Sequence, residues 1–386
     1  MLNAQFDQWL RETRQALHQI PELGFELPKT HQYLKTALEA MGYKPCVVAQ
    51  SGLYVYLPGD AKETIAFRAD MDALPVCEST NLPYQSTHPN QMHACGHDAH
   101  MTMLLGLAKQ LKGKPLNHSV LLIFQPAEEG PGGAKEIVKS GLFERYNVKH
   151  IYGFHVFPGL DAGKIGLRSG PMMAQNGEFD LTVMGQSAHG AQPHLGHDAM
   201  SAGLAYAQAL NTLTAKMITP LIPTVIVLGE FKAGEARNIL AKEALLKGTI
   251  RTFDDTLYQT IKEKMHQLAN GLAHAYGVSM TLEIRDFYPP VINHPSLIKH
   301  LQEALPTDDQ VAIQPLMLAE DFAFYQQVIP GVFMLLGTRT KDPRTHHDLH
   351  SASFDFDESV LLKGVETYLT ILNSFNDSIS LKESTL

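Results

Sequence analysis

Short apolar runs that alternate with helical patterns constrain the fold of this 386-residue chain more than any other feature. Runs rich in β-branched and aromatic residues lie at residues 52–57, 64–70, 119–129 and 150–156. Apolar positions recur at helical spacing over residues 6–20, 30–41, 98–111 and about 132–141. Strands that alternate with helices predict an α/β layer fold with a mixed or parallel sheet. Ligands in such folds gather where strands end and loops begin.

The pattern changes at about residue 177 and returns at about residue 290. Residues 178–189 alternate like a half-exposed strand, and a helix, two strands, a helix and a strand follow up to residue 288. This order resembles an α+β sandwich inserted into the first domain, and "YPPVINHP" (288–295) predicts a hinge back. We therefore expect one domain of residues 1–176 and 290–386 and an inserted domain of residues 177–289. After a strand at 330–337 and a closing helix, we expect a frayed tail from about residue 376.

Composition and charge exclude several classes of protein. The formal charge of −9 and the lack of clustered Lys and Arg argue against a nucleic-acid partner. No stretch approaches the roughly 20 consecutive apolar residues that a membrane span needs, and the polar start lacks the apolar core of a signal peptide. The three cysteines, Cys46, Cys77 and Cys95, form no disulfide framework. We expect a cytoplasmic protein with neither a nucleic-acid nor a membrane partner.

The stretch "MHACGHDAH" (92–100) combines three histidines, a cysteine and an aspartate before an apolar helical run. Cys95 and His97 are two apart, so they face one side only in an extended turn, because a helix would separate them by about 200°. Thiolate and imidazole together suit Zn²⁺ and its first-row neighbours. A buried thiol beside helix-capping histidines remains the alternative for this stretch alone.

Glu128 and Glu129 follow an apolar strand directly, in "FQPAEEGPGGA". Two adjacent unpaired carboxylates repel one another unless a cation lies close. Since neighbouring side chains point in different directions, one could bind metal while the other takes a proton from a water molecule. A solvated helix start would also favour acidic residues.

Other candidate ligands are weaker when taken singly. His155 in "YGFHV" lies within an apolar strand, where a lone histidine is more often a core residue. "HHDLHS" offers His346, His347 and His350, and "RADMDALP" sets Asp70 and Asp72 two apart at a strand end. The chain order of acidic, Cys/His, Glu-Glu, His and late His positions supports a joint metal site more strongly than any one of them does.

Together these motifs resemble the amidohydrolase branch of the M20 metallopeptidase family, which includes aminoacylases, hippurate hydrolase-like enzymes and plant hydrolases of auxin conjugates. The resemblance extends from "LHQIPELGFE" through "RADMDALP", "MHACGHDAHM" and "QPAEEGPGGA" to "SAHGAQP", "GTIRTF" and "FDFDE". It implies an α/β two-domain metallopeptidase, with a mixed-sheet catalytic domain and an inserted α+β sandwich that serves as lid and dimerisation domain. Through this inserted domain the resemblance implies a homodimer or homo-oligomer.

The resemblance implies two divalent metal ions per chain, which could be Zn, Mn, Co or Ni. Their implied ligands are Cys95, His97, Glu129, His155 and His350, with the Cys95 thiolate between the two ions. Glu128 would be the general base, and Asp72 would orient a ligand without touching metal. Asp70 stands where other branches have a histidine ligand, so we expect it beside the ligands.

The resemblance also assigns roles within the inserted domain. His189 of "SAHGAQP" would reach an active site across a homodimer interface and stabilise the tetrahedral oxyanion. Asn238 and Arg251 would hold polar groups of the substrate, with Arg251 pairing with a carboxylate. The family commonly has Ile-Pro after that asparagine, where this chain has Ile239 and Leu240.

The expected reaction is metal-dependent hydrolysis of a linear amide in an N-acyl amino acid, which releases a carboxylic acid and a free amino acid. Glu128 would remove a proton from the attacking water and return it to the leaving amine. We expect the lid to close over this small-molecule substrate. The alternatives are a dipeptidase, an N-acetyl-diaminopimelate deacetylase on the same site, or a non-catalytic metal- or ligand-binding module.

Overall fold

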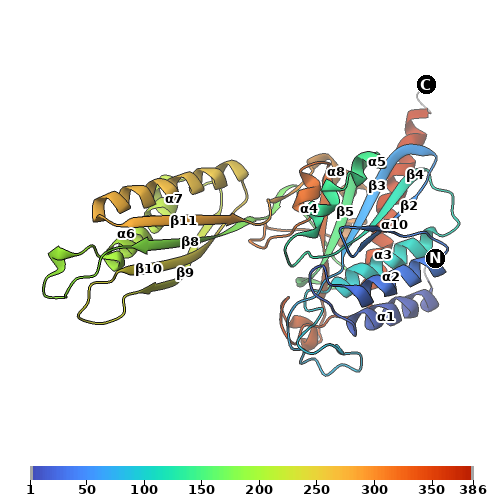
Figure 1. Ribbon diagram of the computed structural model, residues 1–386. Coiled ribbons are helices and arrows are strands. Elements are labelled where there is room, and N and C mark those ends of the chain that lie inside the picture. The colour runs from blue at the N-terminus through green and yellow to red at the C-terminus, as the bar shows by residue number, and fades with distance from the viewer. Residues whose placement is uncertain (1–2, 384–386) are drawn as a thin grey trace. The chain divides into compact units, whose positions relative to one another are not determined.

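The computed structural model describes residues 3–383, apart from the side chains of residues 376–383. The chain divides into two compact units, each described here by itself (Figure 1). The first unit comprises residues 1–170, 292–314 and 321–386, and the second comprises residues 171–291 and 315–320. Residues 315–320 join the second unit, although the sequence pattern placed them in the first. The catalytic and lid roles of the two units stay a prediction.

A mixed eight-stranded sheet forms the centre of the first unit, in the order β1-β2-β4-β3-β5-β14-β6-β13. Its strands are β1 (Cys46–Val48), β2 (Gly52–Leu57), β3 (Ala61–Asp70), β4 (His118–Gln125), β5 (Val148–Asp161), β6 (Ile165–Leu167), β13 (Gln310–Ala312) and β14 (Gly331–Arg339). The central strands β4, β3, β5 and β14 run parallel. All eight residues of β4 are buried, as the apolar run in its sequence predicts for a strand covered on both faces.

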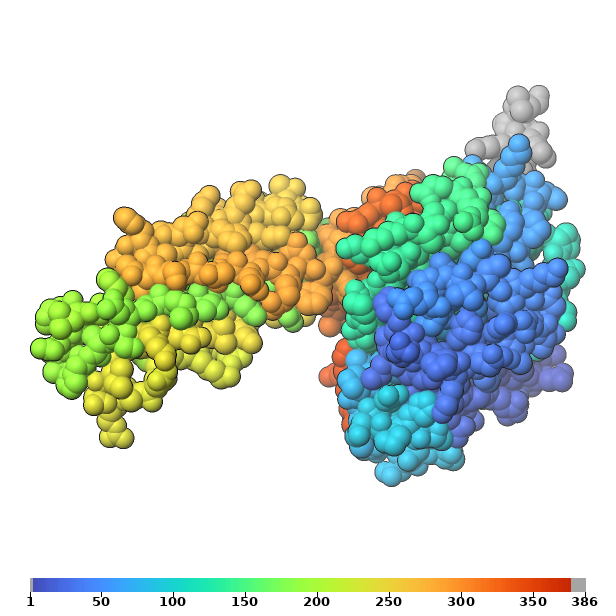
Figure 2. Space-filling view, viewed as in Figure 1, coloured from blue at the N-terminus to red at the C-terminus, as the bar shows by residue number. Residues whose placement is uncertain are grey.

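The helices of the first unit surround this sheet. They are α1 (Ala4–His18), α2 (Pro28–Ala40), α3 (His97–Leu111), α4 (Gly133–Lys139), α5 (Leu142–Arg145), α8 (Pro295–Ala304), α9 (Ala323–Gln326) and α10 (Val360–Glu383), with 3₁₀ turns at Thr307–Asp309 and Pro343–His346. In Figure 1, α1, α2 and α3 lie side by side below the sheet. Atoms of the blue N-terminal segment cover much of the visible face of this unit in Figure 2.

Two helices cover one face of a four-stranded antiparallel sheet in the second unit. The sheet order is β11-β8-β10-β9. The elements are β8 (Gln175–Met184), α6 (Ala199–Thr212), β9 (Thr224–Ala233), β10 (Glu243–Thr252), α7 (Asp255–Tyr276) and β11 (Ser279–Asp286), with short turns at Pro193–Leu195 and Leu213–Met217. Phe179, Leu181 and Val183 of β8 face the helices and are buried, whereas their neighbours are not. The alternation in the sequence predicts this one-sided burial.

The predicted fold class, a mixed-sheet α/β domain with an inserted α+β sandwich, is confirmed. Two short strands, β7 (Gly170–Met173) and β12 (Val291–Asn293), form a separate two-stranded sheet, and β12 lies within the residues predicted as a hinge. Helix α10 continues to Glu383, and residues 384–386 lie outside the described residues, so the fraying expected from about residue 376 stays a prediction. Among residues 3–383, no helix is long and apolar enough to cross a membrane.

Candidate metal centre

Three neighbouring parallel strands deliver acidic and imidazole groups to one edge of the large sheet. Asp70 ends β3 opposite Gln125, which ends β4. Asp72 follows β3 by two residues, Glu128 follows β4 by three, and His155 lies within adjacent β5. The carboxyl ends of parallel strands meet at one edge, which is where α/β sheets place their binding sites.

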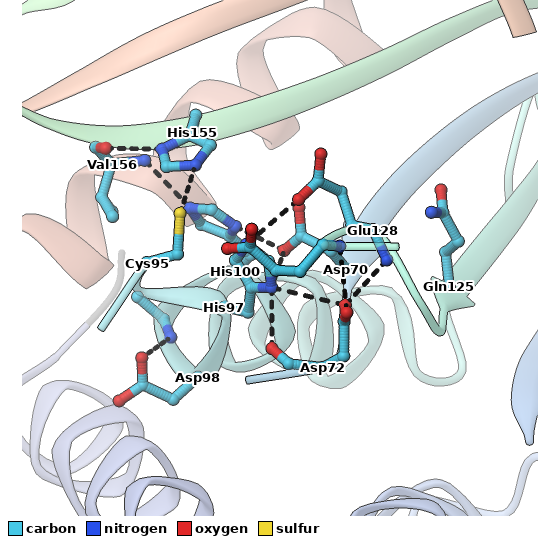
Figure 3. Close-up of polar contacts among 12 residues, drawn as sticks. Asp70, Asp72, Cys95, His97, Asp98, His100, Gln125, Glu128, His155 and Val156 are labelled. Atoms are coloured by element: carbon cyan, nitrogen blue, oxygen red, sulfur yellow. Dashed lines mark hydrogen bonds and ion pairs between the residues drawn. The ribbon is translucent and has the colours of Figure 1, made fainter. Parts of the chain in front are cut away.

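Gly96 sets the geometry of the Cys95-Gly96-His97 turn. Its backbone has φ +81°, and a Cβ there would overlap Cγ2 of Val156 in β5. Only glycine satisfies both conditions without strain. The turn lets α3 begin at His97 and keeps Cys95 just before it, so both buried side chains reach the same cluster (Figure 3).

The sulfur of Cys95 lies between two histidines. Its Sγ is 3.3 Å from Nε2 of His155 and 3.3 Å from Nε2 of His350. Nδ1 of His155 donates to the carbonyl of Val156 at 2.7 Å, which leaves Nε2 free of a proton in the neutral ring. The backbone N–H of His350 donates to the carbonyl of Ala94 at 2.8 Å, so this late segment is attached beside Cys95.

Two groups of metal-ligating atoms share Cys95. One consists of Cys95, His97 and His155, and the other of Cys95, Glu129 and His350. Within each group, one ligand atom per residue lies within 4.8 Å of the others. The structure thus brings together all five predicted metal ligands, and Cys95 is placed where one sulfur could serve two ions.

His97 is oriented by a backbone carbonyl. Its Nδ1 donates to the carbonyl of Asp72 at 2.8 Å. Its Nε2 is buried without a hydrogen-bond partner among the described residues, and lies 3.9 Å from Oε2 of Glu128. A buried ring nitrogen without a partner is unfavourable in a dry interior. The orphaned nitrogen and the thiol, imidazole and carboxylate donors around it fit a bound metal cation.

Asp72 fixes the glutamate pair through the backbone. Its Oδ1 accepts the N–H of Glu128 at 2.9 Å, and its Oδ2 accepts the N–H of Glu129 at 3.0 Å. Both oxygens of one fully buried carboxylate are therefore used to hold the turn after β4. The adjacent glutamates point differently: Glu129 Oε1 lies 3.4 Å from Nε2 of His350, whereas Glu128 faces His97.

The electrostatics of the cluster favour a cation. Burial raises the pKa of the Cys95 thiol well above its usual value, and the charges of Glu129 and Glu128 raise it further. Burial lowers the pKa of His97, but Asp70 and Asp72 outweigh it and raise the value to about 10. Burial lowers the pKa of His155 to about 3, so this ring is neutral. Protons and metal ions compete for the same sulfur and nitrogen atoms, and a cation would relieve the excess of negative charge.

Asp70 lies beside the ligands and pairs with the Arg68 guanidinium and the neutral His100 ring. Its carboxylate contacts Nδ1 of His100 at 2.6 Å and Nη1 of Arg68 at 2.7 Å. Nε2 of His100 accepts the backbone N–H of Val156 at 2.9 Å, so both ring nitrogens are engaged. His100, which the sequence interpretation left without a role, therefore connects Asp70 to the strand of His155. Its spacing of three residues after His97 on one helix face was the available signal.

The remaining predicted site residues lie elsewhere. His189, Asn238 and Arg251 belong to the second unit. The backbone N–H of Gly190 donates to the carbonyl of Asn238 at 2.8 Å, so the loop of His189 is hydrogen-bonded to the loop of Asn238. His189 and Asn238 are exposed, and half-buried Arg251 donates from Nη1 to the carbonyl of Met317 at 2.7 Å. His346 is exposed and contacts Thr340, so of the histidines in "HHDLHS" only His350 joins the described metal-ligating groups.

Comparison with known proteins finds similar proteins over nearly the whole chain. The family model described as peptidase family M20/M25/M40 matches residues 66–374. An uncharacterized hydrolase of Staphylococcus aureus (strain USA300) is 34% identical over 378 residues, which covers 96% of this chain and 99% of the relative.

Two solved structures share the fold over nearly the whole chain. One, from methicillin-resistant Staphylococcus aureus, is proposed to be an aminohydrolase; it is 32% identical with a TM-score of 0.88, covering 95% of this chain and 96% of that one. The other is the Bacillus subtilis protein YXEP, a dinuclear metal-binding peptidase from the M20 family. It is 30% identical with a TM-score of 0.84, covering 97% of this chain and 99% of that one.

Proposed function

The chain belongs to peptidase family M20/M25/M40, and from that premise we propose that it hydrolyses the amide bond of N-acyl amino acids with two metal ions. The observation that carries this proposal is the position of the Cys95 sulfur, 3.3 Å from the Nε2 atoms of both His155 and His350. The products would be a carboxylic acid and a free amino acid.

Cys95, His97, Glu129, His155 and His350 would hold the two ions, with Cys95 common to both. Bound there, divalent ions such as Zn²⁺, Mn²⁺, Co²⁺ or Ni²⁺ would polarise the substrate carbonyl and make a water molecule more acidic. The pairing of thiol with imidazole and carboxylate does not select among these metals. The relative YXEP, described as dinuclear, supports a count of two.

Glu128 is the group that fits the role of general base. The residue is 6% exposed, and Asp72 fixes its backbone. Its Oε2 lies 3.9 Å from Nε2 of His97, so the carboxylate faces the candidate metal site. A water molecule that attacks a substrate at this site would lie close to Glu128. We propose that Glu128 takes the proton from the attacking water and delivers it to the departing amine.

The second unit would bind the substrate and form a homodimer. Asn238 and Arg251 would hold polar groups of the substrate, with the guanidinium facing its carboxylate. His189 would reach the active site of a second copy and donate to the oxyanion. Strand β9 is an edge strand, with Val227 49% exposed in it and Leu204 53% exposed on nearby α6. An open apolar edge is suited to pairing with an identical strand.

The thiols bear on where the reaction takes place. Cys46, Cys77 and Cys95 are all free, and Cys95 must stay reduced to bind metal. We therefore place the reaction in a reducing compartment, the cytoplasm.

A substrate panel tests the proposal and separates it from its competitors. Protein stripped with a chelator is assayed before and after addition of each metal, on N-acetyl, N-benzoyl and indole-acetyl amino acids, N-acetyl-diaminopimelate and a plain dipeptide. Metal-restored cleavage of the N-acyl monocarboxylic amino acids supports the proposal. Preference for the dipeptide, in keeping with YXEP being called a peptidase, would replace it with peptide hydrolysis. Preference for the diaminopimelate derivative would assign a deacetylase. Metal binding without cleavage of any substrate would overturn an enzymatic role.

A further inference from the structure

Helix α1 contributes no residue to the candidate metal centre, yet its inner face ends in two buried cationic side chains. Arg14 and His18 are both 0% exposed. A buried charge is tolerated only when it is paired and hydrogen-bonded. The partners of these two side chains therefore show what the end of α1 does in the fold.

The first partner is the residue that follows a candidate ligand. Nε of Arg14 donates to Oδ2 of Asp98 at 2.8 Å, and Nδ1 of His18 donates to the same oxygen at 2.8 Å. Oδ1 of Asp98 accepts the N–H of Ala99 at 3.0 Å in the first turn of α3. Two side chains of α1 thus fix the turn of α3 that carries His97.

The second set of partners lies just after another candidate ligand. Nη1 of Arg14 donates to Oε1 of Glu358 at 3.3 Å and lies 3.9 Å from Oδ1 of Asp355. The guanidinium also packs over the ring of Phe356, 4.5 Å from its centroid. This segment leads from His350 into α10.

A third segment meets the same two side chains. Nη1 of Arg14 donates to the hydroxyl of Tyr84 at 3.1 Å, and Nε2 of His18 donates to Oε1 of Glu78 at 3.2 Å. Glu78 and Tyr84 lie in the loop between Asp72 and Cys95. Burial and Arg14 lower the pKa of His18, but Asp98 and Glu78 outweigh them and raise it, so His18 donates from both nitrogens.

We infer that Arg14 is a positioning residue for the metal centre, because its guanidinium joins the segments that carry His97 and His350. The inference rests on the proposed function in one respect only, that these residues bind metal. Apolar side chains such as Leu10 and Leu17, both 0% exposed, already attach α1 to the core. A buried ion pair adds little net stability over an apolar contact, so the fixed geometry of the guanidinium is its distinctive contribution. A lysine ammonium lacks the planar fork needed to contact all three segments.

Binding of Co²⁺ to the full-length, chelator-stripped protein tests this inference without an assay of turnover. Coordination of Co²⁺ by the Cys95 thiolate gives a near-ultraviolet charge-transfer absorption, which reports both occupancy and geometry. We expect Arg14→Lys to weaken Co²⁺ binding about tenfold or more, as loss of groups that orient ligands commonly does, and to alter the charge-transfer absorption at saturation.

Two control variants on α1 separate positioning from general destabilisation. Leu10→Val removes one buried methylene from the same helix, one turn before Arg14, without changing a charged group. It should lower the thermal midpoint while leaving Co²⁺ binding unchanged. Arg11→Lys alters the arginine of a half-exposed ion pair with Asp7 and should change neither property.

Glu358→Gln provides a second test on the other side of the contact. Glu358 is 8% exposed, and the substitution keeps the shape of its side chain while removing the charge that faces Arg14. We expect Glu358→Gln to bind Co²⁺ more weakly than the wild type. In the double variant with Arg14→Lys, the loss of binding free energy should be smaller than the sum of the two single losses, because both changes break the same network. If Arg14→Lys does not fold, this variant alone decides.

The outcomes distinguish the inference from the proposed function. Unchanged Co²⁺ affinity and absorption in Arg14→Lys and Glu358→Gln would overturn the inference and leave the metal centre standing. An equal loss of affinity in Leu10→Val would also overturn it, because the effect would then be general. A wild-type protein that binds no Co²⁺ would overturn the proposed function, and the inference with it.

Discussion

Asp72 and Glu128 are joined by a hydrogen bond of 2.9 Å from the amide of Glu128 to Oδ1 of Asp72, while Oδ2 accepts the next amide at 3.0 Å. The carbonyl of the same aspartate accepts Nδ1 of His97 at 2.8 Å. One residue that need not touch metal thus orients the proposed base and two proposed ligands.

Asp72→Asn should reduce metal affinity and turnover by about ten- to a hundredfold. The asparagine amide has one acceptor oxygen, so its NH₂ group would face one of the two backbone N–H donors and leave it unsatisfied. Bound metal is measured by elemental analysis, alongside kcat. Glu136→Gln on the surface of α4 is the matched control, with no expected change. Wild-type values in Asp72→Asn would contradict this role.

Glu128→Gln and His97→Ala should fail in different ways. The first removes a base but no proposed ligand, so metal content should stay near two ions while kcat falls by roughly a hundredfold or more. The second removes a ligand whose Nε2 has no other described hydrogen-bond partner, so metal should be lost. Metal analysis and kcat of the two variants are compared. Appreciable turnover in both variants would show that the roles are wrong.

Gly96→Ala should cost more stability than Gly113→Ala, although both glycines have positive φ values of +81° and +69°. The left-handed backbone costs an alanine about 1 kcal/mol at either position. At Gly96 the added Cβ also overlaps Val156, whereas at Gly113 nothing lies within 4 Å. An extra loss of about 1–3 kcal/mol is therefore expected from overpacking. Chemical denaturation measures it, and equal losses would contradict the close approach.

The sequence predicts local chemistry at this site better than long-range pairing. Cys95 and His97 could be identified as candidate metal ligands because two ligand types lie two residues apart before a helix. Glu128 could be identified as a candidate base because it follows an apolar strand. His155 could not be assigned from its strand alone, since an isolated buried histidine looks the same in a core. Its position next to Cys95 follows from the arrangement of β3, β4 and β5 in the sheet, and its role as a ligand stays a prediction.

The buried ion pairs were not predicted from the sequence. Arg14 pairs with Asp98 across 84 residues, and Arg68 pairs with Asp321 across 253. On a sequence, such residues resemble the polar face of an amphipathic helix or a strand end, because nothing local marks them as buried. The helix predicted near residues 132–141 corresponds to α4, and Gly141, with φ +70°, separates α4 from the short helix α5.

Arg251→Lys should raise KM about tenfold or more for N-acyl amino acids while kcat changes little. An ammonium cannot form the two parallel hydrogen bonds that a guanidinium makes to a carboxylate. The check is a pair of substrates, one with a free carboxylate and one with that group converted to an amide. The variant and the wild type should differ on the first and agree on the second. An equal loss on both would assign Arg251 to structure, through its bond to Met317.

His150→Gln should reduce the loss of stability on acidification from about pH 7 to pH 5. In the wild type, burial lowers the pKa of His150, as do His294, His300 and His118, against the opposing charge of Glu63. Its ring stacks on Phe375 at 5.3 Å, beside the ring of His300. Below about pH 6.5 the unfolded chain takes up a proton that the folded site resists, so this contribution is present above that pH and is lost as the pH falls. Thermal midpoints of chelator-stripped proteins are compared, to exclude metal release. His266→Gln, an exposed histidine on α7, should keep the wild-type profile. A wild-type dependence of the thermal midpoint on pH in His150→Gln would show that the folded protein does not resist protonation of His150.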